Sequence, residues 1–286
     1  MQDTLSRAVR VGLIGSGIQR SRSPALHVAE AAAHGVALTY ELIDLATLGV
    51  GPEALPRLLA EAEAKGFAGL NVTHPCKQAV VHLLDALSDD ARALGAVNTV
   101  QFHAGRRVGH NTDWWGFAES MRRGLPGAPL GHVLLLGAGG AGAAVAHAVL
   151  VLGARRLDVL DTACERAASL AAALRHRFPD RRIEAVDDPA PALAVADGLI
   201  HATPTGMAAH PGLPLPAALL SPRHWVAEVV YVPLETALLA AARRRGCRTL
   251  DGGGMAVFQA AEAFRLFTGV PADADRMLRH FAAMDR

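Results

Sequence analysis

Three polar residues in the first part of the chain could together manage proton transfer at a hydroxyl group. Lys77 ends the segment NVTHPCK, Asn98 stands in GAVNTV, and Asp113 stands in GHNTDWWGF. A lysine can polarise a carbonyl, a carboxylate can orient a group or relay its proton, and an amide can bind a hydroxyl. Each also has an ordinary explanation: a surface lysine, a buried amide bonded to backbone, and a helix N-cap.

Lysine is rare in this chain, which draws attention to Lys77. The only other lysine is Lys65, and every other cationic side chain is an arginine. A desolvated lysine can lose its proton whereas an arginine cannot, so a lysine placed beside a strand end favours a chemical role. The surface explanation fits Lys65 better, because Gly66 marks an exposed helix end.

A glycine-rich turn in the middle of the chain predicts a dinucleotide-binding site. The apolar run VLLL leads directly into Gly137, Ala138, Gly139, Gly140, Ala141 and Gly142, and an alanine-rich helix follows. The first glycine allows a tight turn, the second lets backbone approach a pyrophosphate, and the third permits close packing of helix on strand. The alternative is a glycine-rich turn without a ligand.

An earlier segment, Gly15-Ser16-Gly17, imitates this fingerprint but does not complete it. Its third glycine position is Arg20, and Pro24 delays the next helix. We therefore reject it as a phosphate site.

Asp161 predicts which dinucleotide binds. It ends the second strand of this half, where a carboxylate can accept hydrogen bonds from both ribose hydroxyls and repel a 2′-phosphate. This favours NAD over NADP, although Arg166 could face a phosphate. Asp161 could also be the N-cap of a helix over Ala163 to Arg175.

Two α/β units must position these residues. The first alternates strands with helices, one helix opening at Ser23 as N-cap with Pro24 at the first helical position, another running from Pro52 to Lys65. Its strands are expected at Val9 to Ile14, Ala37 to Ile43 and Gly69 to Val72, in a parallel or mixed sheet. The second unit has expected strands at Val133 to Leu136, Leu157 to Leu160, Arg182 to Val186, Gly198 to Ala202 and Trp225 to Val230.

The fold class is thus α/β, with an N-terminal substrate domain and a doubly wound, Rossmann-type NAD-binding domain. The predicted boundaries are 1–115 and 116–254. The last segment, 255–286, is expected to return to the first domain, with a helix from Met255 to Thr268 that stops at Gly269.

Composition indicates a globular protein with a small-molecule partner. Hydrophobic residues make up 51% and charged residues 19%, and the net charge of +1 gives no reason to expect a nucleic acid or a membrane surface. The start, MQDTLSRAVR, has no signal-peptide pattern, and Cys76, Cys164 and Cys247 fit neither a disulfide framework nor a metal motif. We expect a cytoplasmic monomer or homodimer without a metal ion.

The order of the motifs resembles that of the shikimate dehydrogenase family over nearly the whole chain. The matching segments are SRSPALH, NVTHPCK, GAVNTV, GHNTD, GAGGAG, ATPTGM, YVPLETALL and DGGGMAVFQAAEAF. This resemblance implies hydride transfer between NAD and the C3 hydroxyl of shikimate, quinate or both, giving the 3-dehydro ketone.

The resemblance also implies roles for individual residues. Lys77 and Asp113 would be the catalytic pair, with Lys77 as proton donor and acceptor. Ser21 and Ser23 would hold the substrate carboxylate. The ring hydroxyls would be held by Thr73, Asn98, Asp113 and Gln259, with Tyr231 near the substrate. The nicotinamide and its ribose would meet Thr203, Pro204, Val229, Gly252 and Met255.

Departures from the family pattern concern cofactor and substrate. Where NADP-specific biosynthetic members carry Asn-Arg-Thr, this chain has Asp161-Thr162-Ala163, which shifts the likeness toward NAD-preferring quinate/shikimate dehydrogenases. His201 replaces the family's usual Asn. An NADP-dependent biosynthetic shikimate dehydrogenase or an aminoshikimate-type relative stays open, as does a catabolic role. An S-adenosylmethionine methyltransferase or a silent metabolite sensor would leave Lys77, Asp113 and Gln259 unexplained.

Overall fold

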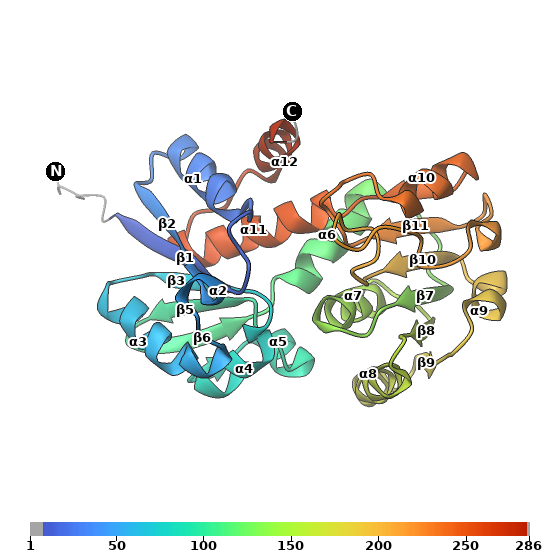
Figure 1. The fold of residues 1–286 in the computed structure, drawn as a ribbon, viewed down its shortest axis with the longest axis horizontal. Helices are drawn as coiled ribbons and strands as arrows, with labels where there is room; N and C mark the ends of the chain where they lie inside the picture. The colour runs from blue at the N-terminus through green and yellow to red at the C-terminus, as the bar shows by residue number, and fades with distance from the viewer. Residues whose placement is uncertain (1–7, 285–286) are drawn as a thin grey trace. The chain divides into compact units, whose positions relative to one another are not determined.

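The computed structural model describes residues 8–284 and divides into two compact units, each with its own sheet (Figure 1). Unit 1 comprises the described residues up to Thr112 and those from Gln259 onward, and unit 2 runs from Asp113 to Phe258. The predicted boundaries at 115/116 and 254/255 fall a few residues away, inside helices α6 and α11. Residues 1–7, in which we expected no targeting signal, lie outside the described part.

Unit 1 is built on a mixed sheet with the strand order β2-β1-β3-β5-β6-β4. The strands β2, β1 and β3 are parallel, whereas β5 runs antiparallel to β3 and to β6. Their bounds are β1 (Val9–Gly15), β2 (Leu38–Asp44), β3 (Gly69–Val72), β4 (Ala86–Leu87), β5 (Thr99–His103) and β6 (Arg106–His110). The expected parallel or mixed sheet is confirmed, but the β5–β6 hairpin was not predicted.

Helices cover both faces of this sheet. Successive residues of β1 point to opposite faces, so they pack against different helices. Val11 packs against Ala263 and Phe267 of α11, while Ile14 packs in a second cluster with Leu55 and Leu59 of α3. The helical segments of this unit are α1 (Ser23–Ala33), α2 (Leu45–Leu48), η1 (Pro52–Ala54), α3 (Leu55–Ala64), α4 (Cys76–Ala79), η2 (Val80–Leu83), α5 (Asp89–Leu94), the end of α11 (Gly253–Thr268) and α12 (Ala274–Ala283).

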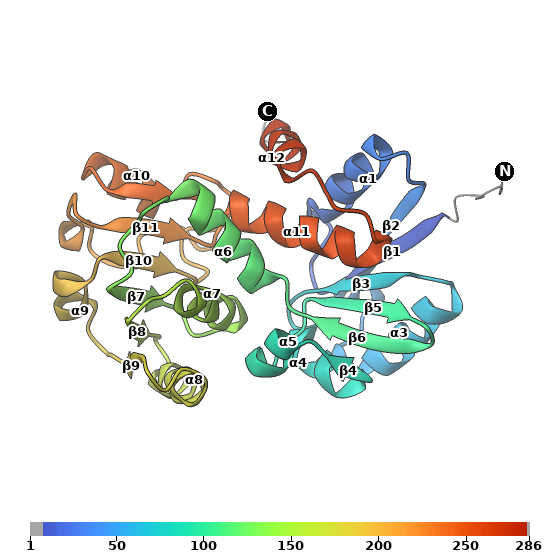
Figure 2. The ribbon, with the colours of Figure 1, turned by 180° about the vertical axis from the view of Figure 1, so that it is seen from behind.

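The C-terminal segment returns to the first unit, as expected. Besides the contact of α11 with β1, Arg276 of α12 donates to both carboxylate oxygens of Glu30 on α1, at 2.8 and 2.7 Å. The Glu30 side chain is only 1% exposed. Figure 2 shows α12 beside α1 and α11 beside β1.

The start of α1 differs from its prediction. Arg22, not Ser23, occupies the N-cap position, and its side chain makes no capping hydrogen bond in the described part of the chain. Ser23 is the first helical residue, and its hydroxyl bonds Tyr40 instead. The predicted Ser23 N-cap is wrong because a partner on β2 takes the hydroxyl.

Unit 2 is a doubly wound parallel sheet, confirming the Rossmann-type prediction. The strand order is β12-β11-β10-β7-β8-β9, in which β7, the first along the chain, lies between β8 and β10. The bounds are β7 (His132–Leu136), β8 (Arg156–Leu160), β9 (Arg182–Ala185), β10 (Gly198–His201), β11 (Trp225–Glu228) and β12 (Arg248–Leu250). Ligands in such sheets bind outside the carboxyl ends of the strands, where the order reverses. Here that point is between β7 and β10.

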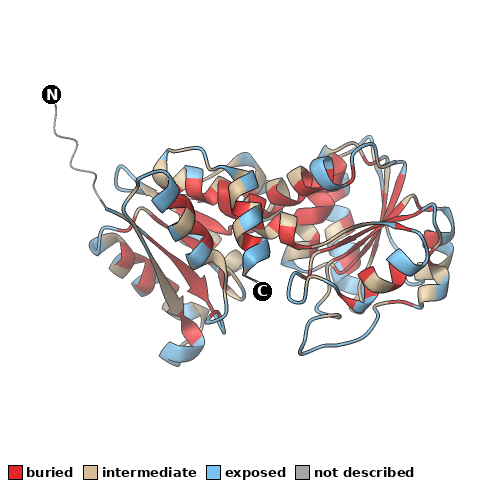
Figure 3. Ribbon diagram, turned by 90° about the horizontal axis from the view of Figure 1, so that it is seen from above, coloured by how far each residue is buried: buried red, intermediate tan, exposed pale blue. Residues whose placement is uncertain are grey.

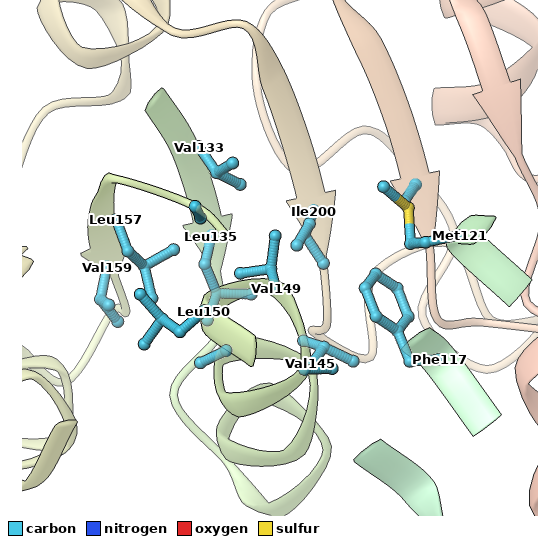
Figure 4. Close-up of a cluster of buried hydrophobic side chains, with 14 of the residues drawn as sticks. Phe117, Met121, Val133, Leu135, Val145, Val149, Leu150, Leu157, Val159 and Ile200 are labelled. Atoms are coloured by element: carbon cyan, nitrogen blue, oxygen red, sulfur yellow. The ribbon is translucent and has the colours of Figure 1, made fainter. Parts of the chain in front are cut away.

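Two apolar layers enclose the unit 2 sheet. Val133 and Leu135 of β7 face α7, where Val145 and Val149 pack with Phe117 of α6 (Figure 4). Leu134 and Leu136 point the other way, into a cluster with residues of α9 and α10. The strands are correspondingly buried, whereas helices expose one side (Figure 3). The helical segments are α6 (Asp113–Gly124), α7 (Gly140–Val151), α8 (Cys164–Arg177), α9 (Pro189–Val195), η3 (Ala217–Leu219), α10 (Ala237–Arg244) and the start of α11.

Within residues 8–284, no helix has the length and apolar character that crossing a membrane would require.

Candidate active site

The predicted substrate residues of unit 1 gather at one edge of its sheet. Ser21 and Ser23 follow the end of β1, Thr73 follows β3, and Asn98 precedes β5. Ile14 pairs with Val72 and Asn71 with Thr99, so these strand ends lie side by side. Two loop contacts join them: the Thr73 N–H donates to Ile14 and the Ser16 N–H to His74, both at 2.9 Å.

A chain of side-chain hydrogen bonds runs along this edge. The Ser23 hydroxyl bonds Tyr40, whose hydroxyl donates to Asn71 Oδ1 at 2.8 Å. Asn71 Nδ2 donates to Thr99 Oγ1, and Thr99 Oγ1 donates to Asn98 Oδ1; both distances are 3.2 Å.

The same chain ends beside the predicted catalytic carboxylate. Asn98 Nδ2 donates to Thr112 Oγ1 at 2.9 Å, and the Thr112 N–H donates to Asn98 Oδ1 at 2.7 Å. Asp113 follows Thr112 directly. Because Thr112 bonds both the nitrogen and the oxygen of the Asn98 amide, this buried group, which is only 3% exposed, is held in one orientation. The chain therefore fixes two predicted substrate residues, Ser23 and Asn98, through partners on β2, β3 and β5 and through Thr112, which follows β6.

Lys77 occupies the short helix α4 and is half-buried. Its carbonyl accepts the Val97 N–H at 2.8 Å, next to Asn98. Since α4 follows Thr73 and Pro75, the position of Lys77 depends on the same strand end as Thr73.

The remaining predicted substrate residues come from both units. Asp113 is the first residue of α6 and is 7% exposed, and Gln259 is a half-buried residue of α11. Tyr231 follows β11 in unit 2, and 37% of it is exposed.

The rejected segment Gly15-Ser16-Gly17 has a different occupant. The carboxylate of Asp44, at the end of β2, accepts the Gly17 N–H at 2.8 Å and the Ile18 N–H at 3.2 Å. A hydrogen bond from Gln19 and these backbone bonds hold the pKa of Asp44 below its usual range. Because a carboxylate already occupies the loop amides, this turn is not available for phosphate, and it instead sets the path toward Ser21.

The glycine turn of unit 2 fits a dinucleotide on its own geometry. Gly137 has a φ of +102°, which a side chain would strain. A methyl group on Gly142 would lie 2.0 Å from the Gly137 carbonyl oxygen, so the third glycine permits close packing. Gly139 caps α7, and apart from neighbouring residues and the backbone of α7 itself, a methyl group on Gly139 or Gly140 would meet no atom of residues 8–284 within 4 Å. Open space therefore faces the N–H groups of the helix start, where a pyrophosphate would bind.

Asp161 connects this turn to the next helix. Its Oδ2 accepts the Ala138 N–H at 2.8 Å, and its Oδ1 accepts from the Ala163 N–H at 2.9 Å and from Arg166 at 2.7 Å. Burial raises the pKa of the Asp161 carboxyl, but these three donors outweigh it and lower that pKa overall. Ala163 holds the N-cap position of α8, so the alternative of Asp161 as N-cap is not the observed geometry. The Arg166 side chain is 60% exposed.

The other predicted cofactor residues lie at the carboxyl ends of β10 and β11 or at the start of α11. Thr203 and Pro204 follow β10, and Val229 follows β11. Gly252 approaches the Val229 backbone so closely that a methyl group would be 2.5 Å from its carbonyl oxygen. Met255 is a buried member of the core beneath α7.

Sequence reasoning missed several residues that hold these groups in place. Tyr40, Asn71, Thr99 and Thr112 complete the chain in unit 1, and Glu228 bonds His201 in unit 2. The signal for Glu228 was available, because a single acidic residue inside the apolar run WVAEVV must find a partner if the strand is buried. Across residues 8–284, no cluster of three or more histidine, cysteine or acidic residues could hold a metal ion.

Two family models match this chain: "Shikimate dehydrogenase substrate binding domain" over residues 13–100 and "Shikimate 5'-dehydrogenase C-terminal domain" over residues 252–280. A shikimate dehydrogenase (NADP(+)) from Streptomyces avermitilis is 62% identical, covering 96% of this chain and 95% of the relative. A quinate/shikimate dehydrogenase (NAD(+)) from Corynebacterium efficiens is 47% identical, covering 97% and 99%. Among solved structures, quinate dehydrogenase from Corynebacterium glutamicum in complex with NAD matches with a TM-score of 0.91 at 47% identity, covering 96% and 99%.

Proposed function

The chain belongs to the shikimate dehydrogenase family and is an oxidoreductase of the shikimate/quinate type, and from that premise we propose that it uses NAD to oxidise the C3 hydroxyl of shikimate, quinate or both. The product is the 3-dehydro ketone, and the reaction is reversible. The observation that carries this proposal is the hydrogen-bonded edge of unit 1, which holds Ser23, Asn98 and the residue before Asp113 in fixed orientations.

In this proposal residues of unit 1, together with Asp113 at the start of unit 2, bind substrate and manage its proton. Ser21 and Ser23 hold the carboxylate, for which the Ser23 hydroxyl turns its one proton from Tyr40 to the substrate, while Thr73, Asn98 and Gln259 bind ring hydroxyls. Lys77 accepts the C3 hydroxyl proton during oxidation and returns it during reduction, and Asp113 orients that hydroxyl. NAD, when bound, supplies the hydride acceptor.

The preference for NAD rests on Asp161. Its carboxylate stands at the end of β8 and is held ionised by three donors. A negative charge there repels a 2′-phosphate and can accept from the ribose hydroxyls. The relatives named as quinate/shikimate dehydrogenases (NAD(+)) support this choice.

A second candidate is an NADP-dependent shikimate dehydrogenase. The 62% identical relative carries that name, and the exposed guanidinium of Arg166 could bind a phosphate if it left Asp161. The two candidates differ in cofactor, and quinate oxidation separates a quinate/shikimate enzyme from a strictly shikimate-specific one.

Initial rates on shikimate and quinate, each with NAD and with NADP, test the proposal directly. We expect the larger kcat/KM with NAD. In Asp161→Asn the ratio of kcat/KM for NADP to that for NAD should rise about tenfold or more, because the repelling charge is gone.

The matched control is Asp188→Asn. Asp188 also accepts a backbone N–H, at the start of α9 in the same unit, but it lies away from the glycine turn in the chain. Its cofactor ratio should not change. A wild-type preference for NADP would contradict the NAD assignment, and absence of turnover with all four pairs would contradict the substrate assignment.

A further inference from the structure

A buried histidine–glutamate pair joins the ends of β10 and β11. His201 and Glu228 are the last residues of these strands and stand opposite each other in the parallel ladder. His201 Nδ1 lies 2.9 Å from each carboxylate oxygen of Glu228, and neither side chain is exposed. Because an ionised carboxylate only accepts hydrogen bonds, Nδ1 carries a proton and donates it.

Glu228 has every oxygen in use. Its Oε1 also accepts the N–H groups of Val229 and Val230, at 2.9 and 3.0 Å, and its Oε2 accepts the Thr236 hydroxyl at 3.0 Å. Thr236 is the N-cap of α10. The carboxylate thus fixes the backbone that follows β11 as well as the start of the next helix.

The second ring nitrogen of His201 contacts the Thr203 hydroxyl. His201 Nε2 lies 2.5 Å from Thr203 Oγ1, and in the neutral imidazole this nitrogen accepts the hydroxyl proton. The Thr205 N–H donates to the same oxygen at 3.3 Å. One lone pair of the Thr203 oxygen is left to accept a hydrogen bond from a ligand.

These contacts reach the elements that surround the cofactor site. A methyl group on Gly137 would lie 2.6 Å from the Ala202 carbonyl and 3.0 Å from the Thr203 methyl carbon, so this loop rests on the glycine turn. Gly252 packs equally closely on the carbonyls of Val229 and Val230. The pair therefore stands behind the strand ends that flank the point where the sheet order reverses.

We propose that His201 and Glu228 are positioning residues for the nicotinamide half of the dinucleotide. Because His201 accepts the hydrogen bond of the Thr203 hydroxyl, the Thr203 oxygen is left as an acceptor for the carboxamide NH₂ group. The pair also holds Val229 beside the nicotinamide ring. This inference rests on the proposed function, since it requires that NAD binds at the carboxyl edge of the unit 2 sheet.

Stability alone is a poor account of this arrangement. A buried carboxylate paired with a neutral imidazole contributes little compared with apolar residues of the same volume, because the buried charge loses its hydration. Unit 2 also contains a useful comparison: His132 Nε2, at the start of β7 and so at the end of that strand opposite the glycine turn, contacts Asp158 Oδ2 in the middle of β8 at 2.9 Å. Asp158 bonds His132 and Arg156, and neither of these is a predicted cofactor residue.

Binding of NADH and of ADP-ribose, measured by calorimetry, distinguishes the two halves of the ligand. In His201→Asn the shorter amide can still donate to Glu228 but does not reach Thr203. We expect the Kd for NADH to rise about tenfold while the Kd for ADP-ribose changes less than twofold. His201→Gln, whose amide reaches further, should recover part of the loss. KM for NAD should rise more than kcat falls.

His132→Asn is the matched control, with a comparable loss in Tm but an unchanged ratio of the two Kd values. If His201→Asn does not fold, Glu228→Gln, which has nearly the same shape, is measured in the same way. Equal weakening of NADH and ADP-ribose, or an unchanged ratio, overturns the inference. A wild-type protein that binds neither ligand contradicts the proposed function itself.

Discussion

At the scale of single residues, chemistry depends on side chains whose surroundings restrict them. Lys77 is half-buried on a short helix, next to a strand end that also carries Thr73. Asn98 cannot turn, because Thr112 uses both ends of its amide. Such restriction matters for catalysis, since groups held in the reacting geometry need not be ordered when substrate arrives.

Replacing Lys77 tests the proposed proton transfer. Lys77→Ala should lower kcat by a hundredfold or more, which is the usual contribution of a general acid–base group. The Kd for NADH should stay within about twofold of the wild type, because Lys77 lies in unit 1 and the glycine turn in unit 2.

The chain provides its own control for this substitution in its only other lysine. Lys65 is exposed at the end of α3, and Lys65→Ala should leave both constants unchanged. Steady-state rates and calorimetry measure both variants. A Lys77→Ala enzyme with wild-type kcat would remove Lys77 from the mechanism.

His27 should make the protein sensitive to mild acid. Its imidazole is fully buried among Tyr40, Phe264 and Phe267, and neither ring nitrogen has a hydrogen-bond partner within residues 8–284. Burial lowers the pKa of His27 to about 3, although the charge of Glu30 opposes this. The stability that depends on neutral His27 is complete above the unfolded pKa near 6.5 and declines as the pH falls below it.

Urea unfolding at pH 7 and pH 5 measures this effect. The wild type should lose about 2 kcal/mol between these values through His27, and His27→Leu should lose that much less. Burial raises the pKa of Glu30, but the hydrogen bonds and charge of Arg276 outweigh it and lower that pKa overall. Below about pH 4.5 the stability that depends on ionised Glu30 therefore also begins to decline, so the effect of His27 is measured above that pH. His103→Gln, an exposed change on β5, should keep the wild-type pH dependence. Equal slopes for wild type and His27→Leu would contradict the assignment.

At the scale of elements, the helix α7 owes its position to one glycine. Gly142 lets the first turn of the helix approach the carbonyl of Gly137, while Val145 and Val149 pack on the sheet. The N–H groups at the helix start then face the open space over Gly139 and Gly140. Packing and ligand binding are therefore coupled through the placement of this helix.

Gly142→Ala should disturb both properties. The added methyl group would stand 2.0 Å from backbone oxygen, so the helix must shift, at a cost of about 1–3 kcal/mol in the free energy of unfolding. The Kd for ADP-ribose should rise at least tenfold. Gly140→Ala, with nothing within 4 Å, should keep or slightly raise the free energy of unfolding. Denaturant unfolding and calorimetry provide both readouts, and an unaltered Gly142→Ala would refute the packing role.

At the scale of the whole molecule, the two units have distinct sheets and distinct cores. The unit 1 sheet mixes parallel and antiparallel strands and carries polar side chains at one edge, whereas the unit 2 sheet is parallel throughout its described strands. We propose that this division is also functional, with substrate bound mainly by unit 1 and dinucleotide by unit 2.

Hydrogen exchange can test that division without any substitution. NADH should slow exchange at residues 137–142 and 201–207 by stabilising local structure in unit 2. Shikimate should instead slow exchange at residues 71–77 and 96–99. Mass spectrometry of peptides from the full chain measures both ligands. Protection by shikimate confined to unit 2 would contradict the assignment of the substrate domain.

Local sequence patterns were sufficient for much of the fold. Apolar runs and glycines identified β1, β3, β7 and β8, because each pattern lies within one element and the period of burial follows from strand geometry. The hairpin β5–β6 escaped prediction because its residues include Gln101, Arg106 and Arg107, and its turn uses Ala104 at a φ of +50°. The position of such strands in the sheet is set by pairing with neighbouring strands, here β5 with β3 and with β6.

The sequence by itself determined the family and the glycine turn and predicted which residues react, since motif order and local spacing carry that information. The tertiary structure alone decided which side chains meet: Ser23 with Tyr40, Asn71 with Thr99, and His201 with Glu228. These partners are separated by 17, 28 and 27 positions along the chain. The last two contacts arise from strand register and the first from the packing of α1 on β2, and both are set across a whole sheet and leave no local pattern.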